Sequence, residues 1–418
     1  MKDKEMDEGL LLQTAINQNS SASINDYQQE NANTPVISNL IKKLKTLEDS
    51  NRHYKECLLL LILINYFFFV FVFAKMYYMT NEYKNLNETN KKKYDSLEYI
   101  VNKMKESDTI FSKLLLYEFN DKYNLDLKLN DSIIRLNRID EEALEIFGKI
   151  QFQNLTELQI YGGEVGINNI DFLKNSQFNN LTSLTIRKTE INDISTLAEV
   201  NMLKLKELSL IENKIEDIST ILNMKINELE IIDVYSNNIQ DISILKKINF
   251  NKLKELNLGD NKIDNIGVFE NKDYPLLEIL NIGNNQIKDI SVISKVKLDK
   301  LKKIVLTNNQ IEDISELAKT NFTNWIEQLI LSGNQIKDIG VLDSINFEKM
   351  VKLDLSYNPI ENIDVLFNCK FNKLESLYLV GVVGDKENRA NFTEKVKSAN
   401  NFPKLKYLYL KNYAKNDL

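Results

Sequence analysis

The chain has 418 residues, of which 27% are charged and 43% hydrophobic, and its formal net charge is -7. This is an ordinary globular composition, and only 4 prolines and 12 glycines argue against a disordered or collagen-like chain. The net negative charge argues against nucleic-acid binding, because phosphate recognition needs a concentrated basic surface. The single histidine, His53, leaves no histidine for a catalytic triad, zinc site or general base in the rest of the chain.

The first 56 residues divide into two predicted segments. Residues 1–33 are polar and rich in Asn, Gln, Ser and Glu, so we predict a disordered tail. Thr34-Pro35 has the pattern of a helix start, with threonine as the N-cap and proline at the first helical position. Apolar residues on one helical face follow, which predicts a juxtamembrane amphipathic helix over 34–56.

An apolar segment comes next. Residues 57–74 read CLLLLILINYFFFVFVFA and contain no charge. With the apolar residues up to Met79, the segment reaches the roughly 20 residues that a helix needs to cross a bilayer. We therefore predict a transmembrane helix over 57–79 and a single-pass membrane protein. The lysines and arginines just before it favour a cytoplasmic N-terminus and extracytoplasmic repeats, although a wider window removes this bias.

Residues 80–128 are predicted to form a helical stalk and an N-terminal cap. Their apolar residues follow a near-heptad spacing: Tyr94, Leu97, Val101, Met104 and Phe111. Two interpretations remain open. The helix either packs against the first turn of the following domain or associates with a second copy of itself.

A repeated unit occupies the rest of the chain, and residues 205–219 (LKELSLIENKIEDIS) show it most clearly. Its asparagine returns at intervals of 24 or 25 residues: Asn213, Asn237, Asn261, Asn285, Asn309, Asn334 and Asn358. A fixed period in this range with the pattern L-x-x-L-x-L-x-x-N-x-I is typical of leucine-rich repeats. The predicted fold over 129–418 is an α/β solenoid, a horseshoe with a parallel concave β-sheet and a C-terminal cap, preceded by the transmembrane helix and the stalk.

Two polar columns of the repeat have structural explanations. The asparagines listed above lie where the chain leaves each strand, so we predict a buried ladder that bonds backbone groups of adjacent turns. Aspartates such as Asp217 and Asp241 precede Ile-Ser and are interpreted as caps of a turn or short helix rather than metal ligands. Together with the lack of a phosphate-binding loop or nucleophile elbow, this predicts no metal, no cofactor and no enzymatic activity.

The cadence L-x-x-L-x-L-x-x-N-x-I-x-D-I-S resembles the repeats of bacterial internalins and of the regulatory subunit of protein phosphatase type one. The resemblance covers about residues 130–413 and implies a curved solenoid with a protein-binding concave face. Those families favour shorter repeats, so their partner-contact positions cannot be transferred to this chain. The transmembrane helix and stalk have no counterpart in the phosphatase subunit.

The partner is expected to contact the outward positions of the strands, where side chains change from turn to turn. Tyrosines gather toward the C-terminal end, and exposed tyrosine is favoured in binding hot spots. Tyr407 and Tyr409 have an alternative role in sealing the end of the core. The predicted contact residues are Asp233, Tyr235, Ile330, Asp354, Tyr357, Tyr378, Tyr407 and Tyr409.

The sequence therefore predicts a membrane-anchored, non-enzymatic protein that binds a protein partner on the concave face of its repeats. The alternative is a cytoplasm-facing regulatory or targeting subunit for an enzyme such as a phosphatase. Membrane orientation discriminates between the two.

Overall fold

The chain divides at residue 107, and the part that the structure describes belongs to the second unit, residues 108–418. The computed structural model describes residues 109–417 except 164–165, 176–177, 225, 227, 322–324 and 412–413. The predicted tail (1–33), juxtamembrane helix (34–56), transmembrane helix (57–79) and first part of the stalk (80–108) lie outside the described residues.

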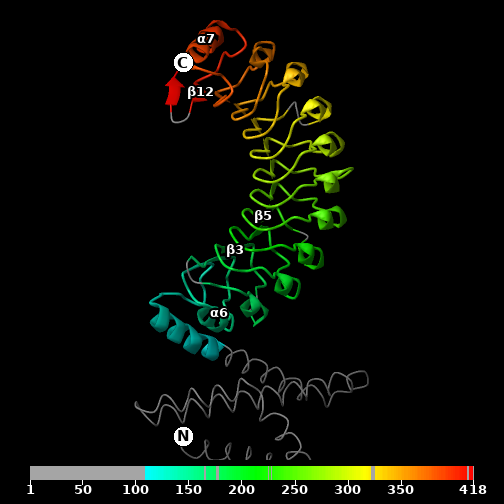
Figure 1. Ribbon diagram of the computed structural model, residues 1–418. Coiled ribbons are helices and arrows are strands. Elements are labelled where there is room, and N and C mark those ends of the chain that lie inside the picture. The colour runs from blue at the N-terminus through cyan, green and yellow to red at the C-terminus, as the bar shows by residue number, and fades with distance from the viewer. Residues whose placement is uncertain are drawn as a thin grey trace, which may run out of the picture. The chain divides into compact units, whose positions relative to one another are not determined.

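The second unit is a solenoid built on one sheet of 13 strands that follow one another in sequence order. Every neighbouring pair from β1 to β12 is parallel, and β13 pairs antiparallel with β12. The sheet lines the inner side of the arc in Figure 1. Its strands are β1 (Ile133–Asn137), β2 (Glu157–Tyr161), β3 (Ser183–Arg187), β4 (Glu207–Ser209), β5 (Ile231–Asp233), β6 (Glu255–Asn257), β7 (Ile279–Asn281), β8 (Lys303–Val305), β9 (Gln328–Ile330), β10 (Lys352–Asp354), β11 (Ser376–Tyr378), β12 (Tyr407–Lys411) and β13 (Ala414–Asp417).

The strands form because each repeat alternates apolar and variable residues, which places the apolar set on one face. In the repeat around β4, Leu208 and Leu210 are buried, whereas Glu207 is only half-buried. Leu208 pairs in register with Leu184 of β3 and Ile232 of β5, so the leucine positions stack as continuous columns through the core. One apolar core therefore runs the length of the solenoid.

The outer side of the solenoid consists of short 3-10 helices, seen as coils on the right of Figure 1. An Asp or Asn side chain caps most of them: Asp217 Oδ1, for example, accepts the Ser219 N–H at 2.7 Å. These helices are η3 (Asp171–Asn175), η4 (Ser195–Ala198), η5 (Ser219–Asn223), η6 (Ser243–Lys247), η7 (Gly267–Phe269), η8 (Ser291–Lys295), η9 (Ser315–Lys319), η11 (Gly340–Ser344) and η12 (Ile363–Phe367).

Helices close both ends of the described array. A helix over residues 109–123 buries Leu116 and Phe119 against the core, and α6 (Glu141–Phe147) lies between β1 and β2. At the other end, α7 (Lys386–Ser398) occupies the long interval between β11 and β12 and buries Phe392 and Val396. These elements cover apolar columns that would otherwise end at solvent.

The fold-class prediction was correct for the solenoid and its parallel sheet, but its membrane-spanning helix requires correction. None of the helices within the described part of the chain is long and apolar enough to cross a membrane. The 13 residues of α7 fall short of the roughly 20 that a span needs, and they include several charged side chains. The transmembrane helix of the fold class and the single-pass localisation derived from it are therefore unsupported and are set aside.

Candidate functional site

The asparagine column links each turn to its neighbour through the backbone. Asn285 is buried, and its Oδ1 accepts the Ile263 N–H at 2.9 Å while its Nδ2 donates to the Leu258 carbonyl at 3.0 Å. The same arrangement recurs at Asn237, Asn261, Asn309, Asn334 and Asn358. Asn213 ends the ladder differently, because it accepts from the Thr189 amide. This column is therefore occupied by internal bonds and does not face a partner.

A column of left-handed residues precedes the asparagines and turns the chain out of each strand. It includes Glu212, Ser236, Asn308 and Tyr357, with φ between 50° and 57°. Gly333 occupies the same position with φ 69°, and a Cβ there would lie 2.0 Å from the Asn308 Oδ1. The left-handed conformation is costly for side chains other than glycine, asparagine and aspartate. Sequence reasoning missed this column because it has no common residue type.

Charged side chains on the flank where the strands begin form an alternating ladder. Glu230 lies between Lys206 and Lys254, with N–O distances of 3.3 and 2.5 Å. The hydrogen bond from Lys254, followed by that from Lys206, lowers the pKa of Glu230. Further pairs join Glu278 to Lys302 at 2.7 Å and, near the C-terminal end, Glu375 to Lys406. Glutamates and lysines of the flank therefore form ion pairs with one another.

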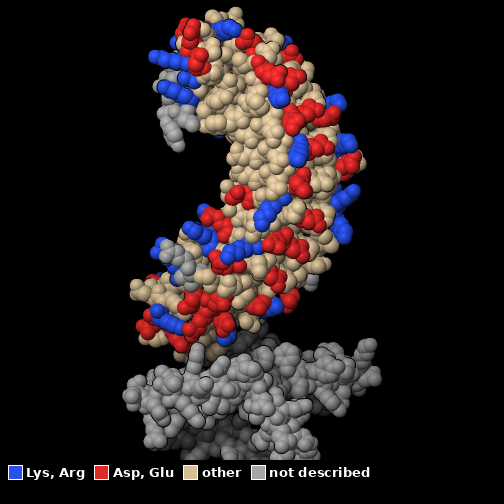
Figure 2. Space-filling model, viewed as in Figure 1, with Lys and Arg blue, Asp and Glu red and all other residues tan. Residues whose placement is uncertain are grey.

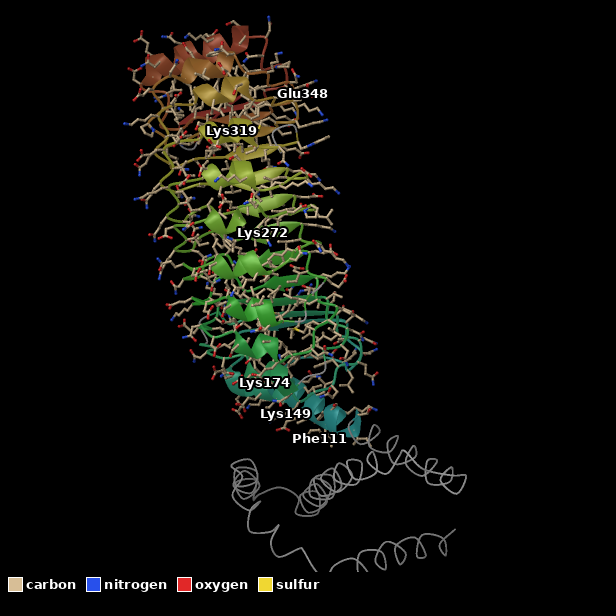
Figure 3. All side chains as sticks on the ribbon, turned by 90° about the vertical axis from the view of Figure 1, so that its right-hand side faces the viewer. Phe111, Lys149, Lys174, Lys272, Lys319 and Glu348 are labelled. Carbon is tan, nitrogen blue, oxygen red and sulfur yellow. The ribbon has the colours of Figure 1, made fainter. Side chains whose placement is uncertain are left out.

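The concave face differs from the flank. Figure 2 shows Lys, Arg, Asp and Glu concentrated along the flank and outer edge, whereas uncharged side chains cover much of the inner surface. The side view in Figure 3 places Lys174, Lys272 and Lys319 on the opposite, outer side. The inner surface is thus less charged than the flank and the outer edge (Figure 2).

At the C-terminal end of this face the structure brings three tyrosines and a lysine together. Tyr378 and Tyr409 stack with ring centroids 4.2 Å apart and an interplanar angle of 7°. Lys352 Nζ lies 4.6 Å from the centre of the Tyr378 ring, and Tyr407 lies 6.4 Å from Tyr409. Burial, more than any contact, raises the pKa of Tyr378. We call these four residues the tyrosine cluster.

The other predicted contact residues are distributed along the same face. Ile330 is only 9% exposed, so less of it is available than the sequence suggested. Asp354 is half-buried and accepts the Ser356 N–H at 3.0 Å. Tyr357 is 52% exposed and lies in the turn after β10, beside Gly381. The tyrosine cluster thus contains side chains of β10, β11 and β12, whereas Tyr357 lies outside it, in the turn after β10.

Asp233 and Tyr235 lie toward the middle of the face, on and just after β5. Asp233 Oδ1 accepts the Tyr235 N–H at 2.9 Å, and burial raises the pKa of its carboxyl. The Tyr235 ring lies over Gly259 of the next turn, where a Cβ would approach its Cδ2 to 3.1 Å. Glycine at this position therefore lets the tyrosine ring lie close to the sheet.

Cys369 needs no functional explanation. It is a free thiol, 1% exposed, and burial raises its pKa to about 12. Among the described residues, no group of three or more His, Cys, Asp or Glu is arranged to hold a metal ion.

The fold and the surface define a leucine-rich-repeat solenoid. Family models of leucine-rich repeats match residues 275–319, as two copies, and residues 251–270 and 324–343, as single repeats. The predicted repeat type is therefore confirmed, and neither model describes an enzyme family. A domain of this kind fits a protein-recognition module.

Solved structures include similar proteins, and the internalin likeness is found among them. An internalin (InlF) from Listeria monocytogenes is 25% identical, with a TM-score of 0.49, over 67% of this chain and 81% of that one. Internalin C2 from the same species is 21% identical over 57% and 84%, with a TM-score of 0.35. The ectodomain of the Arabidopsis thaliana receptor kinase GASSHO1 is 19% identical over 60% and 30%, with a TM-score of 0.43. No curated protein matches the chain.

Proposed function

We propose that this chain is a non-enzymatic recognition protein that binds a protein partner on the concave face of its repeats, with the tyrosine cluster as an anchor. The observation that carries the proposal is the half-buried stack of Tyr378 and Tyr409 on an otherwise uncovered sheet face. Tyrosines of this kind contribute large contact area at a small entropic cost.

The alternation of buried and outward positions supports the same proposal. The core leucines, the asparagine ladder and the aspartate caps are fully engaged within the solenoid, so substitutions there change stability. The outward positions of the sheet belong to none of these three networks, and their residue types differ from turn to turn. We therefore assign binding of the partner protein to the outward positions.

The stack is pre-organised for binding. Lys352 covers one side of the Tyr378 ring and Tyr409 the other, so a partner meets the ring edges and hydroxyl groups. Side chains that are already held in one arrangement lose less entropy when a partner binds. A partner group placed there contacts several side chains from three strands at once.

Site-specific photo-crosslinking tests the proposal in cells of the source organism. A photoreactive phenylalanine analogue replaces Tyr409, and a control chain carries it at Lys319 on the outer side (Figure 3). We expect a discrete higher-mass adduct from position 409 and none from position 319. Equal adducts at both positions, or none at 409, would overturn the proposal.

A further inference from the structure

Three carboxylates of the concave face differ from those of the flank in whether they pair with a lysine or arginine. They occupy outward positions of three successive strands: Glu207 on β4, Asp233 on β5 and Glu255 on β6. No lysine or arginine among the described residues forms an ion pair with them, whereas glutamates on the adjacent flank pair with lysines turn after turn. These three carboxylates are therefore unpaired, whereas Glu157, in the same column on β2, pairs with Arg135.

The neighbours of these carboxylates differ: Glu207 lies between Ser183 and Ile231, and Asp233 between Ser209 and Asn257, whereas Glu255 has apolar neighbours on both sides. Glu255 pairs in register with Ile231 on β5 and Ile279 on β7, and it is half-buried between them. Burial raises the pKa of Glu255, and the negative charge of Asp233 raises it further. Ionised carboxylates in such surroundings gain more from a cation than carboxylates in open water do.

Arg187, the nearest arginine on this face, is already engaged. It pairs with Glu212, in the turn that follows β4. Lys303 lies two strands beyond Glu255, on β8, and its charge lowers the Glu255 pKa. Burial raises the pKa of Asp233, whereas hydrogen bonds from Tyr235 and Asn257 and the charge of Arg187 lower it. Ser183 donates to Glu207, but no lysine or arginine of the described residues pairs directly with the three carboxylates.

The face changes character toward the C-terminal end. After the carboxylates, each of three strands carries one apolar and one polar outward residue: Ile279 and Asn281 on β7, Val305 and Lys303 on β8, and Ile330 and Gln328 on β9. The tyrosine cluster follows on β10 to β12, beside Asp354. From β5 to β11 there are six strand spacings of about 4.8 Å, or about 29 Å, which an extended segment of about nine residues spans. Acidic residues therefore lie at one end of a path of peptide length and aromatic residues at the other, with apolar and polar side chains between them.

We propose that the concave sheet face from β4 to β12 docks an extended segment of the partner protein that carries lysine or arginine at the end facing Glu207, Asp233 and Glu255 and apolar side chains toward the tyrosine cluster. The charge complementarity decides the occupant: a segment without a cation would bury three unpaired carboxylates, which is costly. This inference rests on the proposed function and specifies the chemistry of the partner.

Panning a phage-displayed library of random peptides, each about 12 residues long, against the full chain tests the inference. We expect enriched peptides to carry lysine or arginine at one end and apolar residues at the other. Their affinity should fall about tenfold or more in the variant Glu207→Gln/Asp233→Asn/Glu255→Gln and at about 0.5 M salt. The control Glu228→Gln removes a flank carboxylate that pairs with Lys252 and should leave affinity unchanged.

The outcomes separate the two proposals. Peptides without an excess of basic residues, or peptides that bind the triple variant as well as the wild type but lose affinity in Tyr378→Ala, would overturn the inference and leave the proposed function intact. No enriched peptide, or peptides insensitive to all these concave-face variants, would overturn both. Glu255→Gln alone provides a second test if the triple variant unfolds, because the carboxyl group of Glu255 makes no hydrogen bond within the described residues.

Discussion

The asparagine ladder permits a stability prediction worked out from individual bonds. Asn285 is 8% exposed; its Oδ1 accepts the Ile263 N–H at 2.9 Å, and its Nδ2 donates to the carbonyls of Leu258, Ile282 and Gly283. In Asn285→Ala each of the three carbonyls keeps another donor. The Ile263 amide has no other acceptor within the described part of the chain, so it becomes a buried, unpaired N–H.

The expected cost follows from these two changes. A buried unpaired donor costs about 1–3 kcal/mol, and each lost net hydrogen bond costs about 1 kcal/mol. We therefore expect Asn285→Ala to lower the free energy of unfolding by about 2–4 kcal/mol. Asp289→Ala, which removes an exposed cap of the same repeat, should cost about 1 kcal/mol or less.

Two measurements check this prediction. Urea denaturation followed by circular dichroism and by the fluorescence of Trp325, the single tryptophan, gives the change in stability. Hydrogen exchange gives the local effect, since the Ile263 amide should lose protection in Asn285→Ala but not in Asp289→Ala. The reasoning would be refuted by a change below about 0.5 kcal/mol together with an Ile263 amide that stays protected.

Three further predictions concern single side chains. The Tyr274 hydroxyl is buried without a hydrogen-bond partner in the described structure, so Tyr274→Phe should leave stability unchanged or raise it by about 1 kcal/mol in urea denaturation; a clear loss would contradict this. Because the folded-state pKa of Asp233 is raised, the ionised carboxylate lowers the stability of the folded chain at neutral pH. Asp233→Asn should therefore raise the melting temperature at pH 7. This gain should vanish as the pH falls through the raised pKa of the wild-type carboxyl. A Cβ at Gly148 would lie 2.4 Å from the Phe172 carbonyl oxygen, so Gly148→Ala should cost about 1–3 kcal/mol in the same denaturation assay, whereas Gly166→Ala, with its nearest neighbour at 3.7 Å, should be nearly neutral.

The sequence determines the repeat architecture because the constraints recur with one period. Leucine pairs such as Leu208 and Leu210 predict strands, and the asparagine that follows fixes where each turn leaves the sheet. A pattern repeated this often leaves one arrangement of the buried residues. The class of fold was therefore predictable from spacing alone.

Features that depend on neighbours in space were harder to predict. The stack of Tyr378 on Tyr409 bridges a 31-residue interval that contains α7, and its geometry follows from the register of β11 with β12. The burial of Ile330 depends on side chains of adjacent turns, and the left-handed conformation of Tyr357 has no residue signature. The apolar segment at 57–79 gave a strong hydropathy signal, but hydropathy does not by itself show a spanning helix.

The unpaired carboxylates also required the structure. Spacing alone places Glu207, Asp233 and Glu255 at outward positions. It places the flank residues Glu230 and Lys254 at outward positions as well. Only the contacts show that the flank residues form an ion pair and that the concave residues meet isoleucine and asparagine. Periodicity identifies a column, and three-dimensional contacts identify its role.

The central claim is tested most directly by the affinity of a crosslinked and identified partner for variants of the full chain. We predict that Tyr378→Ala weakens binding about tenfold or more while circular dichroism shows an intact array, and that Lys319→Ala on the outer side binds like the wild type. Equal affinity of the wild type and Tyr378→Ala would contradict recognition through the concave face.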